Sequence, residues 1–402
     1  MKINIDMLDV MRKATSLLKE GQKGSATGLI QQVLQRVLPG AQPQHQPDQP
    51  VMKDINPPPP GRESSAKAPY TAPSADAEAN PQSAGMNAGV PAFVADLLER
   101  FGINTPGGSP QPKHGDGPSP AGGQFLSESL TNAAGTRKYK LYVPQAYTGQ
   151  ALPLVVMLHG CTQNPDDFAA GTEMNAQAEQ TPCFVLYPAQ SESANTSKCW
   201  NWFKAIDQKR EQGEPSIIAD ITRKIIASYN INTKQVYVAG LSAGGAMAAI
   251  MGHTYPDLYA AVGVHSGLPF GAATDLPSAM QAMRSGMNAA RAATSSNRDA
   301  LPIIVFHGDR DSTVSPRNGE QLIQQQVRAG GRASVETGSV PGGHTYTRTL
   351  HATNDGAPLA EQWLIHGAGH AWSGGSSKGT YTDQRGPQAT REMMRFFATQ
   401  TQ

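Results

Sequence analysis

Short, continuous apolar runs recur through the C-terminal two thirds of the chain, with helix-favouring stretches between them. Such runs are typical of strands that are buried on both faces of a parallel sheet. Their alternation with helices predicts an α/β domain over residues 123–402, with a mostly parallel central sheet flanked by helices. The predicted buried strands are Leu154–Leu158, Phe184–Tyr187, Gln235–Ala239, Ala261–His265, Ile303–His307 and Glu361–His366.

The ends of this region have their own signals. Arg137–Val143 is strand-like and follows a predicted hairpin turn at Ala133–Thr136. A terminal helix is expected at about Pro387–Thr399. In parallel α/β sheets the chemistry gathers where the strands end, so candidate residues are sought there.

The first 122 residues have a different pattern. Residues 1–40 predict a hairpin of two amphipathic helices, roughly Ile5–Lys19 and Ser25–Leu38. Residues 41–122 contain 16 of the 31 prolines and few large apolar side chains, which predicts a disordered linker. A hairpin this small buries little surface alone, so we expect it to self-associate or to dock on a partner. A loosely ordered pair of helices is the alternative.

The charge balance of the chain argues against two classes of binding partner. The net charge is +1, from 33 basic and 32 acidic residues, so no global field favours nucleic acid or an anionic membrane. The sequence shows no secretory signal pattern and no run of ~20 apolar residues that would span a membrane. We therefore expect a cytoplasmic protein, with secretion by a non-classical route as the alternative.

The stretch Gln235–Ile250 predicts a strand, a sharp turn and a helix, and the turn reads Gly240-Leu-Ser-Ala-Gly244. In this context a G-x-S-x-G pattern indicates a nucleophile elbow, which exposes the serine hydroxyl above the sheet. We therefore predict that Ser242 is a nucleophile. A second match, Gly375–Gly379, lies in a Gly/Ser-rich stretch with no strand before it and is interpreted as a loop.

A nucleophilic serine needs a base that is oriented by an acid, and in this arrangement the chain order is serine, acid, histidine. After Ser242, the strand Ile303–His307 leads to two candidate acids, Asp309 and Asp311. We predict Asp311, because Gly308 turns the chain and leaves this residue further out over the sheet edge. Asp309 is the alternative, with a turn-stabilising role otherwise.

The base is predicted to be His370, in a loop between the last strand and the terminal helix. His366 is expected to end the strand, and His344 and His351 bracket a strand-like segment. Such a site also needs two backbone amides that face the developing oxyanion. The amide of Ala243, directly after the nucleophile, is one predicted donor, and that of Cys161, in the turn after Leu154–Leu158, is the other.

Five segments of the predicted domain carry a family resemblance: His159–Gln163, Cys199–Phe203, Gly240–Gly245, Val264–Gly267 and Gly369–Gly374. Together they resemble the polyhydroxybutyrate (PHB) depolymerase-type esterases, which are α/β-hydrolases related to feruloyl and acetylxylan esterases. The resemblance runs from about Gln124 to Phe397. It implies an α/β-hydrolase fold and a Ser-His-Asp carboxylic-ester hydrolase that uses no cofactor.

The resemblance bears on the cysteines and tryptophans as well. It implies a disulfide between Cys161 and Cys199, whereas three cysteines in a chain without a signal peptide favour reduced thiols. Trp200, Trp202 and Trp372 lie beside the expected site loops, where they would bind substrate or pack beneath the loops. No Cys/His spacing resembles a zinc site, so no metal is expected.

The family leaves the substrate open, because its members act on polyesters, aryl esters and sugar esters. The leading hypothesis is hydrolysis of poly- or oligo(3-hydroxyalkanoate) esters through an acyl-enzyme. The alternatives are a feruloyl- or acetylxylan-type carbohydrate esterase and a non-catalytic protein of the same fold that binds granules or a partner. Under the leading hypothesis the N-terminal hairpin would dock on a granule or self-associate.

Overall fold

The computed structural model describes residues 122–402, apart from 289–300, 328–331 and 355. The predicted hairpin of residues 1–40 lies outside the described residues. The predicted linker does too, except for its last residue. The proposals for these two segments therefore remain predictions from the sequence.

The described residues form a ten-stranded sheet in the order β1-β2-β4-β3-β5-β6-β7-β10-β9-β8. The pairs from β4 to β10 are parallel, and the strands at both edges are antiparallel. The strands are β1 (Gln124–Asn132), β2 (Gly135–Val143), β3 (Leu152–Leu158), β4 (Phe184–Pro188), β5 (Ile231–Leu241), β6 (Ala261–His265), β7 (Ile303–Gly308), β8 (Arg332–Ser339), β9 (Thr345–Ala352) and β10 (Pro358–Ile365).

All six predicted buried strands, the hairpin before β2 and the terminal helix are confirmed. Strand β8 was not predicted, because it is exposed along nearly its whole length and has no apolar run. A two-stranded pairing of β11 (Trp372–Ser373) with β12 (Thr382–Asp383) was also not predicted. It holds together the loop that contains His370.

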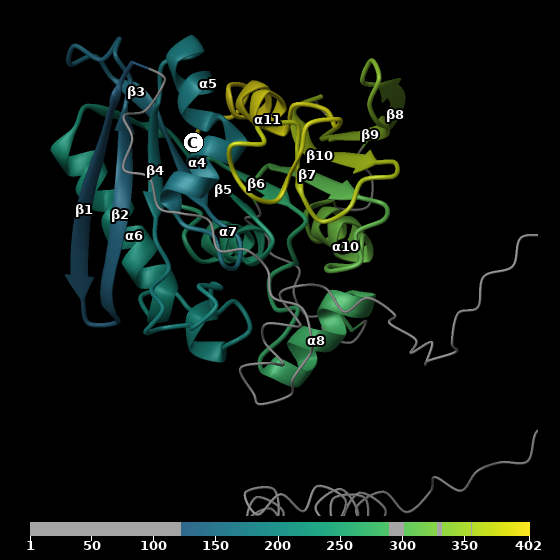
Figure 1. The fold of residues 1–402 in the computed structure, drawn as a ribbon, viewed down its shortest axis with the longest axis horizontal. Helices are drawn as coiled ribbons and strands as arrows, with labels where there is room; N and C mark the ends of the chain where they lie inside the picture. The colour runs from purple at the N-terminus through teal and green to yellow at the C-terminus, as the bar shows by residue number, and fades with distance from the viewer. Residues whose placement is uncertain (1–121, 289–300, 328–331, 355) are drawn as a thin grey trace, which may run out of the picture. The chain divides into compact units, whose positions relative to one another are not determined.

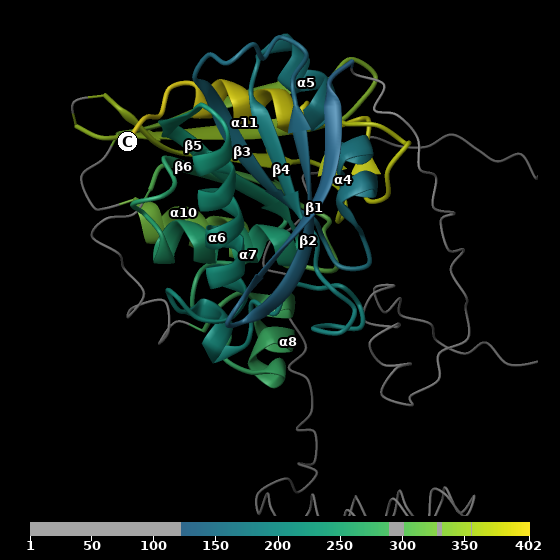
Figure 2. The same ribbon diagram turned by 90° about the vertical axis from the view of Figure 1, so that its left-hand side faces the viewer.

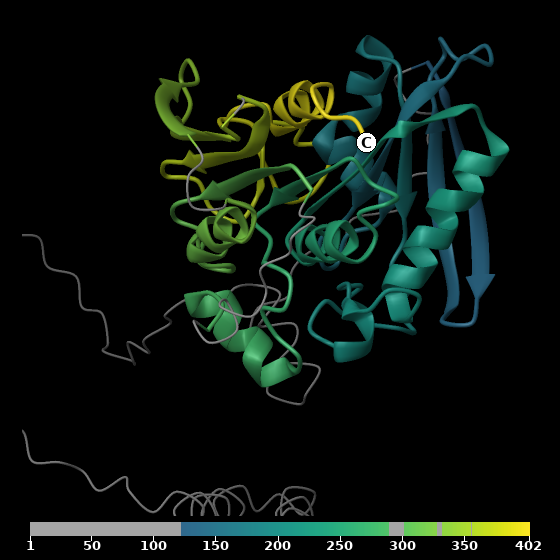
Figure 3. The ribbon, with the colours of Figure 1, turned by 180° about the vertical axis from the view of Figure 1, so that it is seen from behind.

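Helices cover both faces of the sheet. Figures 1 and 2 show α4, α5 and α11 on one face and α6, α7 and α10 on the other, and Figure 3 shows the second face from behind. The helices are α4 (Pro165–Thr172), α5 (Met174–Gln180), α6 (Gly213–Ser228), α7 (Ala243–Thr254), α8 (Leu276–Ser285), α10 (Arg317–Gln326) and α11 (Ala389–Phe397), with a 3₁₀ turn η1 (Ala205–Gln208).

The alternation of side chains along β3 explains the two layers. Leu154, Val156 and Leu158 pack into the core beneath α6 and α7, whereas Val155 and Met157 pack into the core beneath α4, α5 and α11. All five are fully buried. Burying an apolar side chain of this size contributes about 1.5–3 kcal/mol to folding, so a strand without an exposed face anchors both layers at once.

The junction between β5 and α7 is packed too tightly for any side chain but hydrogen at two positions. A Cβ atom on Gly244 would overlap the carbonyl oxygens of Leu158 and His159. A Cβ atom on Gly240 would overlap the backbone of Gly244. The helix can therefore start directly over the end of β3 only because both residues are glycine.

We predict that Gly244→Ala lowers the free energy of unfolding by about 3 kcal/mol, because the new methyl group meets rigid backbone rather than a movable side chain. Gly369→Ala is the matched control, since nothing lies within 4 Å of a Cβ at that position. Chemical denaturation of both variants measures the difference. Equal stability of the two variants would contradict the packing described for the junction.

Candidate active site

Ser242 sits at the turn between β5 and α7 in a strained conformation, with φ 57° and ψ −120°. Left-handed backbone is costly for a residue other than glycine, by about 1–3 kcal/mol. It persists here because the Ser242 amide donates to the His265 carbonyl at 2.9 Å and the flanking glycines allow the close approach. Ser242 is partly exposed while Leu241 and Ala243 are buried. The predicted elbow geometry is therefore present.

Asp311 and His370 lie together, as the sequence predicted. The Nδ1 atom of His370 is 2.7 Å from Oδ2 of Asp311. The other carboxylate oxygen accepts from the amides of Thr313 and Val314 at 2.9 and 2.8 Å. Burial alone raises the pKa of Asp311, but hydrogen bonds from His307 and His370 outweigh it and hold the pKa well below its usual value. The carboxylate therefore stays charged and fixed beside the imidazole.

Asp309, the alternative acid, is paired with a different histidine. Its Oδ2 lies 3.0 Å from Nδ1 of His366, and its Oδ1 accepts from the Gly367 amide at 2.7 Å. The second ring nitrogen of His366 bonds the Thr347 hydroxyl at 2.9 Å. Asp309 thus fastens the start of the loop that contains His370, which is the structural role that the alternative interpretation gave it.

His344 and His351, the other histidines after the acid, lie at either end of β9. His344 bonds Asp383 through Nε2 at 2.7 Å. His351 lies within the strand and pairs in register with Ala360 of β10. Both positions agree with the predicted strand-like segment.

His265 joins the elbow to the loop that contains His370, a role that the sequence analysis did not identify. Its carbonyl accepts from the Ser242 amide, and its Nε2 accepts from the Ser373 amide at 2.9 Å. Burial lowers the pKa of His265 to about 3, so the ring stays neutral and can accept. The ring also stacks on Trp372 with centroids 5.2 Å apart. The sequence signals were its place at the end of a buried strand and within the segment Val264–Gly267 of the family resemblance.

The Ser242 hydroxyl has no hydrogen-bond partner among the described residues, so it is not bonded to His370 in this structure. Contacts of this kind are often long in a ligand-free site and tighten when substrate binds. The structure instead connects the two segments through a third residue. The Ser242 amide of the elbow and the Ser373 amide of the loop that contains His370 both donate to His265.

The turn after β3 presents the predicted oxyanion donor. Thr162 has φ 65°, and its amide donates to the Ser197 carbonyl at 2.7 Å. The Gly160 amide donates to Oε1 of Gln163 at 2.9 Å. In the part of the chain that the structure describes, the amides of Cys161 and Ala243 have no acceptor. These two predicted donors are therefore free to bind an anionic oxygen.

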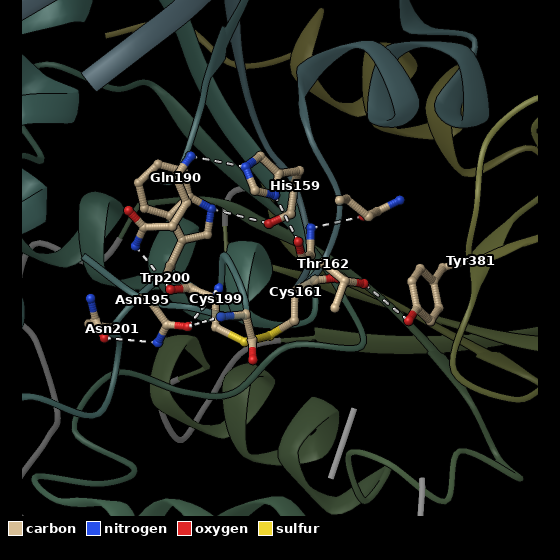
Figure 4. Close-up of a disulfide and its surroundings, with 12 residues drawn as sticks. His159, Cys161, Thr162, Gln190, Asn195, Cys199, Trp200, Asn201 and Tyr381 are labelled. Atoms are coloured by element: carbon tan, nitrogen blue, oxygen red, sulfur yellow. Dashed lines mark hydrogen bonds between the residues drawn. A yellow bond between two sulfur atoms is a disulfide. The ribbon is translucent and has the colours of Figure 1, made fainter. Parts of the chain in front are cut away.

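This turn is tied to the segment Cys199–Phe203, here called the Trp-rich loop, by a disulfide between Cys161 and Cys199 (Figure 4). The structure thus has the pairing that the family resemblance implied rather than free thiols. Trp200 donates from its indole to the His159 carbonyl at 3.1 Å. Burial lowers the pKa of His159 to about 4, and the neutral ring accepts from the Gln190 amide through Nε2 at 3.1 Å.

A buried carboxylate holds the other side of that loop, and the sequence analysis missed it. Glu214 accepts from the Asn201 amide at 2.7 Å, the Asn201 side chain at 2.6 Å and Gln190 at 2.5 Å. Arg137 lies 3.3 Å from the same carboxylate. Burial, and then the nearby Asp207, raises the pKa of Glu214. An acidic residue at the start of a helix is ordinary in sequence, so only the fold reveals its role.

Two of the three tryptophans proposed to bind substrate are fully buried instead. Trp200 and Trp372 have no exposed surface, and the Trp372 indole donates to the Thr390 hydroxyl at 3.1 Å. Both pack beneath the loops of the site, because their large rings fill the space between loop and sheet. Trp202 is 6% exposed and packs edge-on against Phe203. The packing alternative therefore replaces the proposed substrate contacts of Trp200 and Trp372.

The described residues contain neither a metal-binding group of side chains nor a helix that could span a membrane. No group of three or more His, Cys, Asp or Glu side chains in these parts is arranged to hold a metal ion. Within the same ranges, no helix has the length and apolar character that would let it cross a membrane.

The known proteins with similar sequences include polyester depolymerases and acetylxylan esterases. Poly(3-hydroxyalkanoate) depolymerase C of Paucimonas lemoignei is 33% identical over 255 residues, which cover 61% of this chain and 60% of that protein. Poly(3-hydroxybutyrate) depolymerase of Ralstonia pickettii is 28% identical over 240 residues, which cover 56% of this chain and 48% of that protein. Acetylxylan esterase A of Talaromyces purpureogenus is 30% identical over 209 residues, 48% of this chain and 53% of that protein. The chain thus spans about half to three fifths of their lengths.

Among solved structures, an acetyl xylan esterase from Aspergillus awamori matches with a TM-score of 0.53 and 18% identity, covering 69% of this chain and 99% of that chain. This likeness shows that the fold is that of the α/β-hydrolases. The family model described as esterase PHB depolymerase matches residues 137–348, which is more than half of the chain. The protein therefore belongs to the esterase PHB depolymerase family.

Proposed function

We propose that the protein is a serine carboxylic-ester hydrolase that acts on poly- or oligo(3-hydroxyalkanoate) esters through Ser242, His370 and Asp311. The observation that carries the proposal is the 2.7 Å contact between His370 Nδ1 and Asp311 Oδ2. In the neutral imidazole one nitrogen carries the proton, and a carboxylate partner selects Nδ1 for it. Nε2 is then left with a lone pair to take a proton from the serine hydroxyl.

The reaction proceeds in two steps. Ser242 Oγ attacks the ester carbonyl carbon while its proton passes to Nε2 of His370, and the alcohol leaves with that proton. Water then attacks the acyl-enzyme, with His370 again accepting a proton and returning it to Ser242 as the carboxylic acid departs. Asp311 stays ionised throughout and stabilises the imidazolium, which its low pKa favours. Only groups of this chain and water take part.

The amides of Cys161 and Ala243 stabilise the oxyanion in each step. Removing one donor from an oxyanion hole typically costs 10²–10³ in rate, so both must be held in place. The disulfide and the Thr162–Ser197 bond support the Cys161 peptide, and the start of α7 supports the Ala243 peptide. Both donors come from the main chain, so side-chain substitution does not remove them directly.

The choice of substrate rests on relatives. Two of them are named as poly(3-hydroxyalkanoate) and poly(3-hydroxybutyrate) depolymerases. Others are named acetylxylan and feruloyl esterases, which supports a carbohydrate ester as the second candidate. Both candidates use the same groups and differ in the pocket around them.

Hydroxybutyrate trimer and methyl ferulate separate these candidates when both are given to the same enzyme. We expect the trimer to have the higher kcat/KM. Ser242→Ala and His370→Ala should each lower kcat by roughly 10³-fold or more while the fold stays intact, because the triad acts as a unit. Rates of acid release, with circular dichroism as the control for folding, measure the effect.

Three outcomes would each contradict one part of the proposed function. Retention of more than about a tenth of the activity by Ser242→Ala would remove the elbow from the mechanism. Higher kcat/KM on methyl ferulate would move the substrate to the aryl and sugar esters. A wild-type protein that hydrolyses neither ester would favour a binding protein on the same fold.

Two matched substitutions test which aspartate acts as the acid. Asp311→Asn should lower kcat by roughly 10²–10⁴, because an amide partner no longer selects the productive tautomer of His370. Asp309→Asn should cost less than about tenfold, since Asp309 contacts His366 and Gly367 rather than His370. Steady-state kinetics on one soluble ester compares the two, and the reverse ranking would assign the acid role to Asp309.

A further inference from the structure

Tyr381 is one of the few large apolar side chains that the described residues leave exposed, with 38% of its surface accessible. It lies in the loop between β11 and β12, downstream of His370. Its backbone has φ 53°, a left-handed conformation that glycine adopts readily and a bulky residue adopts rarely. An exposed aromatic ring held in such a conformation needs an explanation.

The loop is fastened on both sides of this residue. The Tyr381 carbonyl accepts from the Trp372 amide at 2.7 Å, which bonds it to the segment that follows His370. The neighbouring Thr380 donates its amide to Asp167 of α4 at 2.9 Å and its hydroxyl to the same side chain at 2.6 Å. Gln163 donates to the Thr380 carbonyl at 3.1 Å. The ring is therefore presented from a fixed backbone.

The phenol reaches the turn that carries the proposed oxyanion donor (Figure 4). Its oxygen lies 3.3 Å from the Thr162 hydroxyl, which itself donates to the Cys161 carbonyl at 2.6 Å. Because the Thr162 proton is used on Cys161, the Tyr381 hydroxyl must be the donor to Thr162. Tyr381 is thus two hydrogen bonds from Cys161, the residue whose amide is the proposed oxyanion donor.

Thr162 shares the two unusual properties of Tyr381. It is exposed, and its φ of 65° is rare for a β-branched residue. Two strained, exposed residues from distant parts of the chain therefore meet at one point, between the oxyanion turn and the His370 loop. Strain of this kind gathers at sites that contact ligands.

We propose that Tyr381 is a specificity-determining residue, whose exposed ring contacts the repeat unit beyond the one that is cleaved, a unit that an oligomer has and a methyl ester lacks. This inference rests on the proposed esterase function and assigns part of its substrate surface. An aromatic face provides apolar contact for such a hydroxyacyl unit, and the fastened backbone of the loop presents the ring. Neither Trp200 nor Trp372 is exposed, so neither of these rings presents an aromatic face to a substrate.

The test compares Tyr381→Asn and Tyr381→Phe on hydroxybutyrate trimer and on methyl 3-hydroxybutyrate, with acid release followed at constant pH. Asn removes the ring but tolerates left-handed backbone, so the loop should keep its conformation. We expect Tyr381→Asn to raise KM for the trimer on the order of tenfold, with kcat and the methyl ester nearly unchanged. Tyr381→Phe keeps the ring and should keep the wild-type KM.

Val335→Asn on edge strand β8 is the matched control, because it also removes an exposed apolar side chain, 65% accessible, far along the sheet. It should change neither ester. An equal fall in kcat on both esters for Tyr381→Asn and Tyr381→Phe would overturn the proposal and make the Thr162 bond a support for the oxyanion turn. Unchanged kinetics in both variants would show that the ring does not contact the substrate.

Failure of the esterase function itself is distinguishable from failure of this inference. If wild-type protein and Ser242→Ala hydrolyse both esters at the same slow rate, the function fails, and with it the role of Tyr381. If Ser242→Ala alone abolishes hydrolysis while both Tyr381 variants match the wild type, only the inference fails.

Discussion

The arrangement of the candidate site depends on one buried residue, His265 at the end of β6. Its carbonyl fixes the strained Ser242 amide, and its neutral ring accepts from the segment that follows His370. Burial keeps the ring uncharged, with a pKa of about 3, so the acceptor is present at neutral pH. The proposed nucleophile, Ser242, and the proposed base, His370, come from distant parts of the chain. Their two segments are placed relative to each other because Ser242 and Ser373, which follows His370 in the same loop, are both bonded to His265.

Other loops of the candidate site are held in a similar way. Polar side chains accept hydrogen bonds from the backbone of loops that have no regular structure of their own. The buried Asp311 accepts two backbone amides as well as His370, and the buried Glu214 accepts from the Trp-rich loop, whereas the half-buried Asp167 accepts from the loop that contains Tyr381. An unpaired buried acceptor costs about 1–3 kcal/mol, so each loop is stable only in the conformation that supplies the donors. The rigid sheet and these few carboxylates together hold the loops of the candidate site.

Much of the site was predictable because its signals are local. The apolar runs predict the strands, and Gly240 and Gly244 predict the elbow. The position of Asp311 shortly after β7 makes it the predicted acid. What the sequence could not reveal depends on contacts between distant segments. Trp200 and Trp372 look the same in sequence whether they line a pocket or fill the core, and only the packing of their loops decides. Glu214 and His265 were missed for the same reason.

Ser242 is proposed to be the single activated nucleophile of the described domain, and covalent labelling tests this role most directly. Incubation of the full chain with a fluorophosphonate, followed by mass spectrometry of the intact protein and its peptides, should show one equivalent per chain on the peptide that contains Ser242. Ser242→Ala should take up none, because a serine reacts this way only when a base activates it. Labelling on any other residue, or equal labelling of Ser242→Ala, would contradict the assignment.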